Sequence, residues 1–238
     1  MYSLNDEEKK RLAEGIRAAF AIPFIDDVED FIWEAIFAYA KGIETTDPLK
    51  NIRSKRLFDV IDKERKIGWS VKAVQRAIYL PCDHEVVIQR ADIFKKAIRL
   101  GFDSLSSDSP TEDLGAALLK HWYVEKVNKD AQIQEVEDKR VCILLKSPDR
   151  KKYVYFEDKL IEYHNEELKW DWTDISKTGL QARRRSDNAL IFRWYPNQKQ
   201  FFERFVFPET AYEFSIEPER LVASDMVALL LAKLEGKL

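Results

Sequence analysis

The chain has 238 residues, of which 45% are hydrophobic, and its formal net charge is −3. This length and composition allow a sizeable core and exclude a wholly disordered protein. Only 7 Gly, 2 Cys and 3 His are present, without phosphate-loop or metal-ligand spacing. These counts argue against a glycine-built nucleotide site, a disulfide framework and a zinc hydrolase. The charged N-terminus and the lack of a long apolar run predict a cytoplasmic protein without a signal peptide or membrane span.

Two helices are expected to open the chain. The first begins at Asn5 or Asp6, which are good N-cap residue types, and it carries apolar side chains on one face. The second follows the acidic pair at 26–27 and ends at Gly42, a helix C-terminal signal. Glu34 lies among the apolar residues of this second helix.

A β-hairpin follows, with strands over 56–61 and 67–74 and a charged turn over 62–66. A helix is then expected from about His84 to Leu100, with Gly101 as its end, and another from Ser109 to about Asp130.

The second half is rich in strands. Apolar runs predict strands over 141–145 and 153–156, and a further hairpin joins 189–195 to 200–207. A last helix is expected over about 224–234. This order of elements predicts an α/β fold with a central mixed sheet flanked by helices and with extra β-hairpins in the C-terminal half.

Side-chain alternation in the first hairpin brings chemistry-bearing residues together. Asp59 lies on the strand face opposite its apolar neighbours, and Ser70 and Lys72 share one face of the second strand. Because neighbouring strands lie about 4.8 Å apart, Asp59 and Lys72 are expected to meet. A carboxylate can hold Mg²⁺, and a lysine beside it can stabilise charge on a phosphate, as phosphodiester hydrolysis requires. Asp62 is a competing metal ligand, although its place at the turn favours a solvated role.

Asp59 followed by Ser70-Val71-Lys72 resembles the PD-(D/E)XK nuclease motif, although Phe58 stands where proline is commonest. Ser70 occupies the position of the second acid. In a subgroup of restriction endonucleases the motif reads Ser-Val-Lys and the acid lies on the following helix, and Glu85 has the corresponding spacing here. The gap between Asp59 and Lys72 is shorter than in that subgroup.

This resemblance covers roughly residues 28–100. It implies a single restriction-endonuclease-like domain over 1–238, with a catalytic core at about 28–146 and a β-rich DNA-recognition part at about 147–216. It assigns Mg²⁺ to Asp59 and Glu85, the chemical step to Lys72, and a supporting role to Glu34. It further implies a homodimer that cuts double-stranded DNA at specific sites, paired with a DNA methyltransferase.

Several residues are candidates for DNA contact. Gln89 and Arg90 follow Glu85 by one turn of the expected helix and are of types that read purine edges. Basic side chains outnumber acidic ones in residues 53–76 and 176–204, which attracts phosphates. Within the second of these segments, a polar loop is expected over 178–186, and it holds Arg183, Arg184 and Arg185. An ordinary solvated surface explains these charges about as well.

Three alternatives remain open on the sequence. The first is a repair or structure-specific nuclease with the same active site. The second is a non-catalytic DNA-binding module, which the serine at position 70 favours. The third is a protein-interaction domain that uses the acidic N-terminal helices as its surface.

Overall fold

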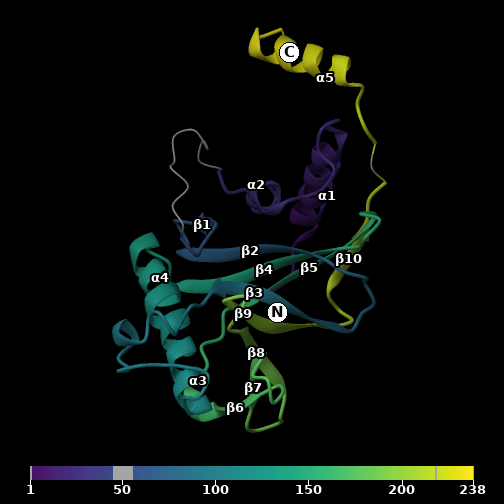
Figure 1. Ribbon diagram of the computed structural model, residues 1–238. Coiled ribbons are helices and arrows are strands. Elements are labelled where there is room, and N and C mark those ends of the chain that lie inside the picture. Colours follow the sequence, from purple (N-terminus) through teal and green to yellow (C-terminus); the bar gives the residue numbers. More distant parts are fainter. Residues whose placement is uncertain (1, 45–55, 218, 238) are drawn as a thin grey trace. The chain divides into compact units, whose positions relative to one another are not determined.

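The computed structural model describes residues 2–44, 56–217 and 219–237 (Figure 1). The chain divides into two compact units that are each discontinuous in sequence. The first unit comprises Met1–Tyr79, Asp138–Lys159 and Thr210–Leu238, and the second comprises Leu80–Glu137 and Leu160–Glu209. Residues 53–55, which belong to the first basic segment, lie outside the described residues.

The first unit begins with the two expected helices, α1 (Asp6–Ala21) and α2 (Asp30–Lys41), and it also contains the C-terminal helix α5 (Ala223–Leu234). Asn5 caps α1: its side chain accepts the N–H of Glu8, and the Glu8 carboxylate accepts the N–H of Asn5. This reciprocal capping box supplies partners for amides that lack them inside the helix. Gly42 ends α2 with a φ of 69°, a left-handed conformation that glycine adopts without strain.

The strands of the first unit form one mixed sheet in the order β1-β2-β4-β5-β10. Their bounds are β1 (Val60–Asp62), β2 (Ile67–Gln75), β4 (Asp138–Lys146), β5 (Lys152–Lys159) and β10 (Tyr212–Ser215). β2 and β4 run parallel, and the other neighbouring pairs are antiparallel. The expected first hairpin is therefore confirmed as β1 and β2, and Figure 1 shows α1 and α2 beside this sheet.

A buried ion network holds the first unit together around Glu157 of β5. Its carboxylate is fully buried and accepts hydrogen bonds from Trp69 Nε1 and Arg140 NH1, both at 2.8 Å, and from the Tyr155 hydroxyl. Lys41 of α2 places its Nζ 3.0 Å from the same carboxylate. Burial raises the pKa of Glu157, but the charge of Lys41 and these hydrogen bonds outweigh it and hold the pKa below its usual value. Glu157 is thus an ionised structural anchor between α2 and the sheet.

The second unit contains an antiparallel sheet in the order β3-β9-β8-β7-β6. Its strands are β3 (Cys82–Arg90), β6 (Leu168–Trp172), β7 (Leu180–Arg184), β8 (Leu190–Tyr195) and β9 (Gln200–Phe207). Its helical segments are η1 (Ile98–Leu100), α3 (Thr111–Leu119), η2 (Lys120–Asn128), α4 (Lys129–Gln134) and η3 (Asn165–Glu167). The segments α3, η2 and α4 follow one another without a break, and η2 is a π-helix. The expected hairpin over 189–207 is confirmed as β8 and β9.

The helix expected from His84 to Leu100 is wrong. Residues 82–90 form strand β3, which pairs with β9, and only Ile98–Leu100 is helical in the remainder. The β-branched run Val86-Val87-Ile88 favours a strand, and pairing with β9 settles the choice. Gly101 ends the short η1 with a φ of 88°, and not the long helix that the sequence predicts.

The core of the second unit includes a carboxyl group. Along β9, Phe201, Glu203, Phe205 and Phe207 alternate with more exposed residues, so Glu203 points into the apolar interior with 7% of its surface exposed. Burial raises the pKa of Glu203 to about 8, and no cation among the described residues offsets that rise. Glu203 is therefore neutral over most of the physiological pH range, and ionising it costs folding free energy.

The architecture is α/β, with a mixed sheet and an antiparallel sheet flanked by helices. Across the described ranges no helix combines the length and the apolar character that a membrane crossing needs.

Candidate active site

Asp59 lies immediately before β1, between buried Phe58 and Val60. Its backbone N–H donates to Trp69 O at 2.9 Å, and its side-chain Oδ2 accepts the N–H of Val71 at 2.8 Å. The Asp59 carboxylate therefore accepts the Val71 N–H in the way that a backbone carbonyl of a neighbouring strand would, at the end of the β1–β2 pairing. Two hydrogen bonds to β2 fix its position.

Lys72 extends from β2 toward the same carboxylate. Its Nζ lies 3.9 Å from Asp59 Oδ2 and donates to Val71 O at 3.1 Å. The Asp59 and Lys72 side chains are 21% and 28% exposed, so solvent reaches both. The two residues meet as their alternation along the hairpin predicts.

Ser70 and Glu34 belong to the same unit. Ser70 is buried on β2 with its Cα opposite that of Val141 on β4. Glu34 is half-buried on α2, the helix that carries Trp33 and Phe37 into the core. Trp69 and Val71 belong to that core, whereas Ser70 and Lys72 alternate with them and therefore point to the other face of the sheet.

Glu85 has a different environment from the one we expected. It lies within β3, not at the start of a helix, and it belongs to the second unit, whereas Asp59 belongs to the first. Its carboxylate forms an ion pair with Arg193 at 2.8 Å and approaches Arg204 NH1 at 4.0 Å. Two arginines thus already compensate the negative charge of Glu85, which the resemblance assigns to metal binding.

Gln89 and Arg90 lie at the end of β3, so their expected place one helical turn after Glu85 is wrong. The strand register shifts between Val87 and Gln89, and the Gln89 Nε2 atom lies 3.2 Å from His121 Nε2. Arg90 is exposed. Their contact with DNA stays a prediction.

Arg183 and Arg184 are not in a loop, because Leu180–Arg184 is strand β7, whereas Arg185 lies in the turn that follows this strand. Arg183 donates to Asn188 O at 3.0 Å, Arg184 pairs with Asp187 at 2.6 Å, and Arg185 pairs with Glu112 at 3.1 Å. These partners offset much of the local positive charge, although exposed pairs of this kind contribute little free energy and exchange readily.

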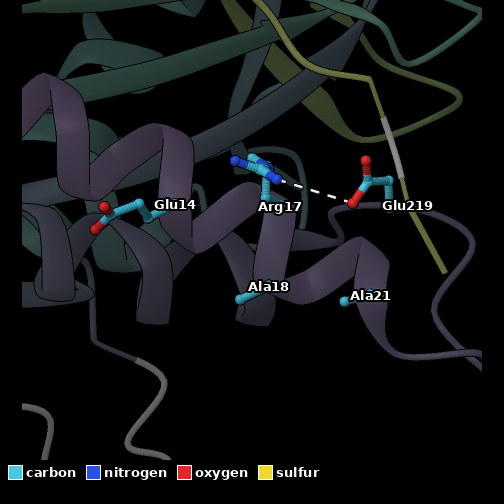
Figure 2. A pocket seen from close by; sticks show the side chains of 5 residues that line it. All are labelled: Glu14, Arg17, Ala18, Ala21 and Glu219. Carbon is cyan, nitrogen blue, oxygen red and sulfur yellow. Dashed lines mark ion pairs between the residues drawn. The ribbon is translucent and has the colours of Figure 1, made fainter. Parts of the chain in front are cut away.

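Two shallow hollows lie on the surface of the first unit, and neither is lined by a residue predicted for catalysis. The first, of about 230 Å³, is lined by Glu14, Arg17, Ala18 and Ala21 of α1 and by Glu219 (Figure 2). Arg17 NH2 and Glu219 Oε2 are 3.9 Å apart across it. The second, of about 400 Å³, lies between α1 and α2 and contains Ala35, Ile36 and Tyr39. Neither hollow brings together groups suited to catalysis.

Within residues 2–44, 56–217 and 219–237, no cluster of three or more His, Cys, Asp or Glu side chains could hold a metal ion. A divalent ion at Asp59 would therefore depend on water and substrate oxygens for its other ligands. Mg²⁺ commonly binds in this way, through one or two carboxylates and the phosphates of a substrate. The carboxylate of Asp59 beside Lys72 fits that mode in type.

Comparisons of the sequence with protein-family models and with curated proteins, and of the structure with solved structures, find no match. Function therefore has to be argued from the site itself.

Proposed function

We propose that the chain is a Mg²⁺-dependent endodeoxyribonuclease that cuts double-stranded DNA at specific sites, as a homodimer in the cytoplasm. The observation that carries the proposal is the 3.9 Å approach of Lys72 Nζ to Asp59 Oδ2 on one hairpin. A carboxylate and a lysine held together at a solvent-reached position suit the hydrolysis of phosphodiesters. The same site in a structure-specific repair nuclease is the nearest alternative.

The candidate catalytic residues have different roles in this proposal. Asp59 would hold Mg²⁺, which when bound polarises the phosphate and lowers the pKa of a water molecule. Lys72 would donate hydrogen bonds to a phosphate oxygen and to the attacking water, which places the water in line and offsets developing negative charge. Ser70 would leave room beside Lys72. A supporting role for Glu34 stays a prediction, because α2 packs on the sheet face of Trp69 and Val71, opposite Lys72.

The proposal is tested by incubating the protein with supercoiled plasmid and Mg²⁺. Discrete linear fragments are expected with Mg²⁺ or Mn²⁺, and no cleavage is expected in EDTA, because the assigned ligands are oxygens. A smear of products would favour the structure-specific or non-specific nuclease. Intact plasmid under all ionic conditions would refute catalysis, and cleavage that persists in EDTA would refute the role of the metal.

The role of Glu85 is decided by comparing three variants. If Glu85 is a metal ligand, Glu85→Gln loses most cleavage and regains part of it at high Mg²⁺ concentration, while Ser70→Ala loses little. Arg193→Met is the matched control, because it removes the ion-pair partner and keeps the carboxylate. It should cleave like the wild type. Equal losses in Glu85→Gln and Arg193→Met would assign Glu85 to the ion pair alone.

A non-catalytic DNA-binding module is the second candidate. Ser70 at the position of the second acid and the pairing of Glu85 with Arg193 both favour it. Such a module would bind DNA with the usual steep salt dependence but leave the plasmid intact at every Mg²⁺ concentration.

A further inference from the structure

Three ionisable side chains of the second unit are linked in one chain of hydrogen bonds. His121 Nδ1 is 2.7 Å from Glu125 Oε2, and His121 Nε2 is 2.9 Å from Lys96 Nζ. Only 3% of His121 is exposed, whereas Lys96 and Glu125 are half-buried. Because an ionised carboxylate only accepts, His121 donates through Nδ1–H, which leaves Nε2 to accept from the lysine. Glu125 thus orients the imidazole, and the imidazole faces the amine.

Irregular backbone brings these groups together. His121 and Glu125 lie on the π-helix η2, and Lys96 lies just before η1. The irregular register in β3 places Gln89 Nε2 3.2 Å from His121 Nε2. The Gln89 Oε1 atom is buried and has no hydrogen-bond partner among the described residues. β-bulges and π-helical turns occur preferentially at functional sites, and a buried amide oxygen without a partner is costly in a purely structural role.

The surroundings of this cluster disfavour the state in which Lys96 and His121 are both protonated. Burial and the nearby Arg99 lower the pKa of Lys96, against the opposing charges of Glu125 and Asp92. Burial also lowers the pKa of His121, and the charge of Lys96 adds to that effect against the hydrogen bond that His121 donates to Glu125. Lys96 Nζ and His121 Nε2 lie 2.9 Å apart, so the two groups titrate together. A state in which one proton lies between them is favoured over a state in which both groups are protonated. The amine of Lys96 is therefore unprotonated more often than that of a solvated lysine.

We propose that Lys96 is a nucleophilic amine, with His121 as its base and Glu125 as the positioning residue, and that it forms an imine with an aldehyde. A nucleophile within hydrogen-bond reach of a base that a third group orients is the arrangement by which proteins activate weak nucleophiles. The amine nitrogen adds to the carbonyl carbon, both amine protons pass by way of His121 to the carbonyl oxygen, and that oxygen leaves as water. The products are one imine and one water.

The neighbouring charges define the class of aldehyde. Arg90, Lys95 and Arg99 are exposed cations in the segments that surround Lys96. Arg99 also pairs with Glu125 at 2.6 Å and so lies at the cluster itself. Such surroundings favour an aldehyde that carries an anionic group, because cations concentrate anions near a surface.

The test uses the full chain with glyoxylate, a small anionic aldehyde, and cyanoborohydride, which reduces the imine to a stable amine. Mass spectrometry of peptides gives the rate of modification of each lysine at pH 7. Lys96 should react at least ~10-fold faster than exposed Lys95, because proton transfer to a positioned base typically contributes about 10²-fold or more to such a step. Equal rates for Lys96 and Lys95 would overturn the proposal.

Variants separate activation from mere exposure. His121→Gln should reduce the rate at Lys96 to that at Lys95 and leave Lys95 unchanged, and Glu125→Gln, the milder change, should give an intermediate rate. If His121→Gln does not fold, Glu125→Gln alone decides, and an unchanged Lys96 rate in it contradicts the triad. Acetaldehyde, which is neutral, should react more slowly than glyoxylate at Lys96 relative to Lys95. An equal ratio for the two aldehydes would refute the anionic preference.

Discussion

Replacing Lys72 with alanine is expected to reduce plasmid cleavage by at least ~100-fold, the usual cost of removing a group that stabilises transition-state charge. DNA affinity should stay close to that of the wild type, because one amine adds little to a large phosphate interface. The Lys72 and Asp59 side chains are partly exposed, so loss of their ion pair should change stability little. Single-turnover cleavage and equilibrium binding measure the two effects separately.

Lys10→Ala is the matched control for this experiment. Lys10 is an exposed lysine of α1 outside both basic segments, so its removal takes the same charge from the same unit without touching a candidate for DNA contact. It should cleave like the wild type. Cleavage by Lys72→Ala within tenfold of the wild type would remove Lys72 from the chemical step, as would an equal loss in both variants.

Glu203→Gln is expected to stabilise the second unit increasingly as pH rises. The pKa of Glu203 is raised from 4.5 to about 8, so the folded state binds its proton more tightly than the unfolded state. The stabilisation from this group is complete below the unfolded pKa and is lost as pH rises through the folded pKa. At ~1.4 kcal/mol per unit, the wild type loses up to ~5 kcal/mol across this window. Glutamine has no proton to lose there.

Hydrogen exchange of β8 and β9 peptides measures this effect within the second unit. Between pH 6 and pH 9 the advantage of Glu203→Gln over the wild type should grow by ~3 kcal/mol, after correction for the intrinsic exchange rate. Exposed Glu209 provides the control, and Glu209→Gln should show no such growth. An advantage of Glu203→Gln that stays constant with pH would mean that Glu203 is already ionised at pH 6.

Local signals in the sequence predict much of the fold. The cap at Asn5, the glycine at 42 and the charged turn after β1 each depend on residues close together in the chain, and α1, α2 and the first hairpin form as expected. The division into two sheets depends on distant pairings. Gln75 of β2 lies opposite Lys146 of β4, and Cys82 of β3 lies opposite Phe207 of β9. No local pattern encodes such partners.

The same distinction between local signals and distant pairings applies to the candidate site. Asp59 and Lys72 meet because they lie on one hairpin, where alternation alone places them. Spacing along the sequence predicts a helix at Glu85, whereas this residue lies in strand β3, and no local pattern points to its partner Arg193. The network around Glu157 has a partial signal, since an acid follows the apolar run Tyr153–Phe156. The cluster of Lys96, His121 and Glu125 has none, because it combines residues from an irregular segment and a π-helix.

The interleaving of the two units in sequence has a consequence for biosynthesis. β2 leaves the ribosome well before its parallel neighbour β4, because the whole first segment of the second unit, Leu80–Glu137, is translated between them. β3 cannot pair with β9 until β9 has been translated, which happens only after β4 and β5. A nascent chain therefore carries unpaired strand edges from both units until β9 and β10 have been translated, and such edges favour edge-to-edge association. Truncation at any point between β1 and β10 would leave the sheet of the first unit unfinished, because both strands belong to it.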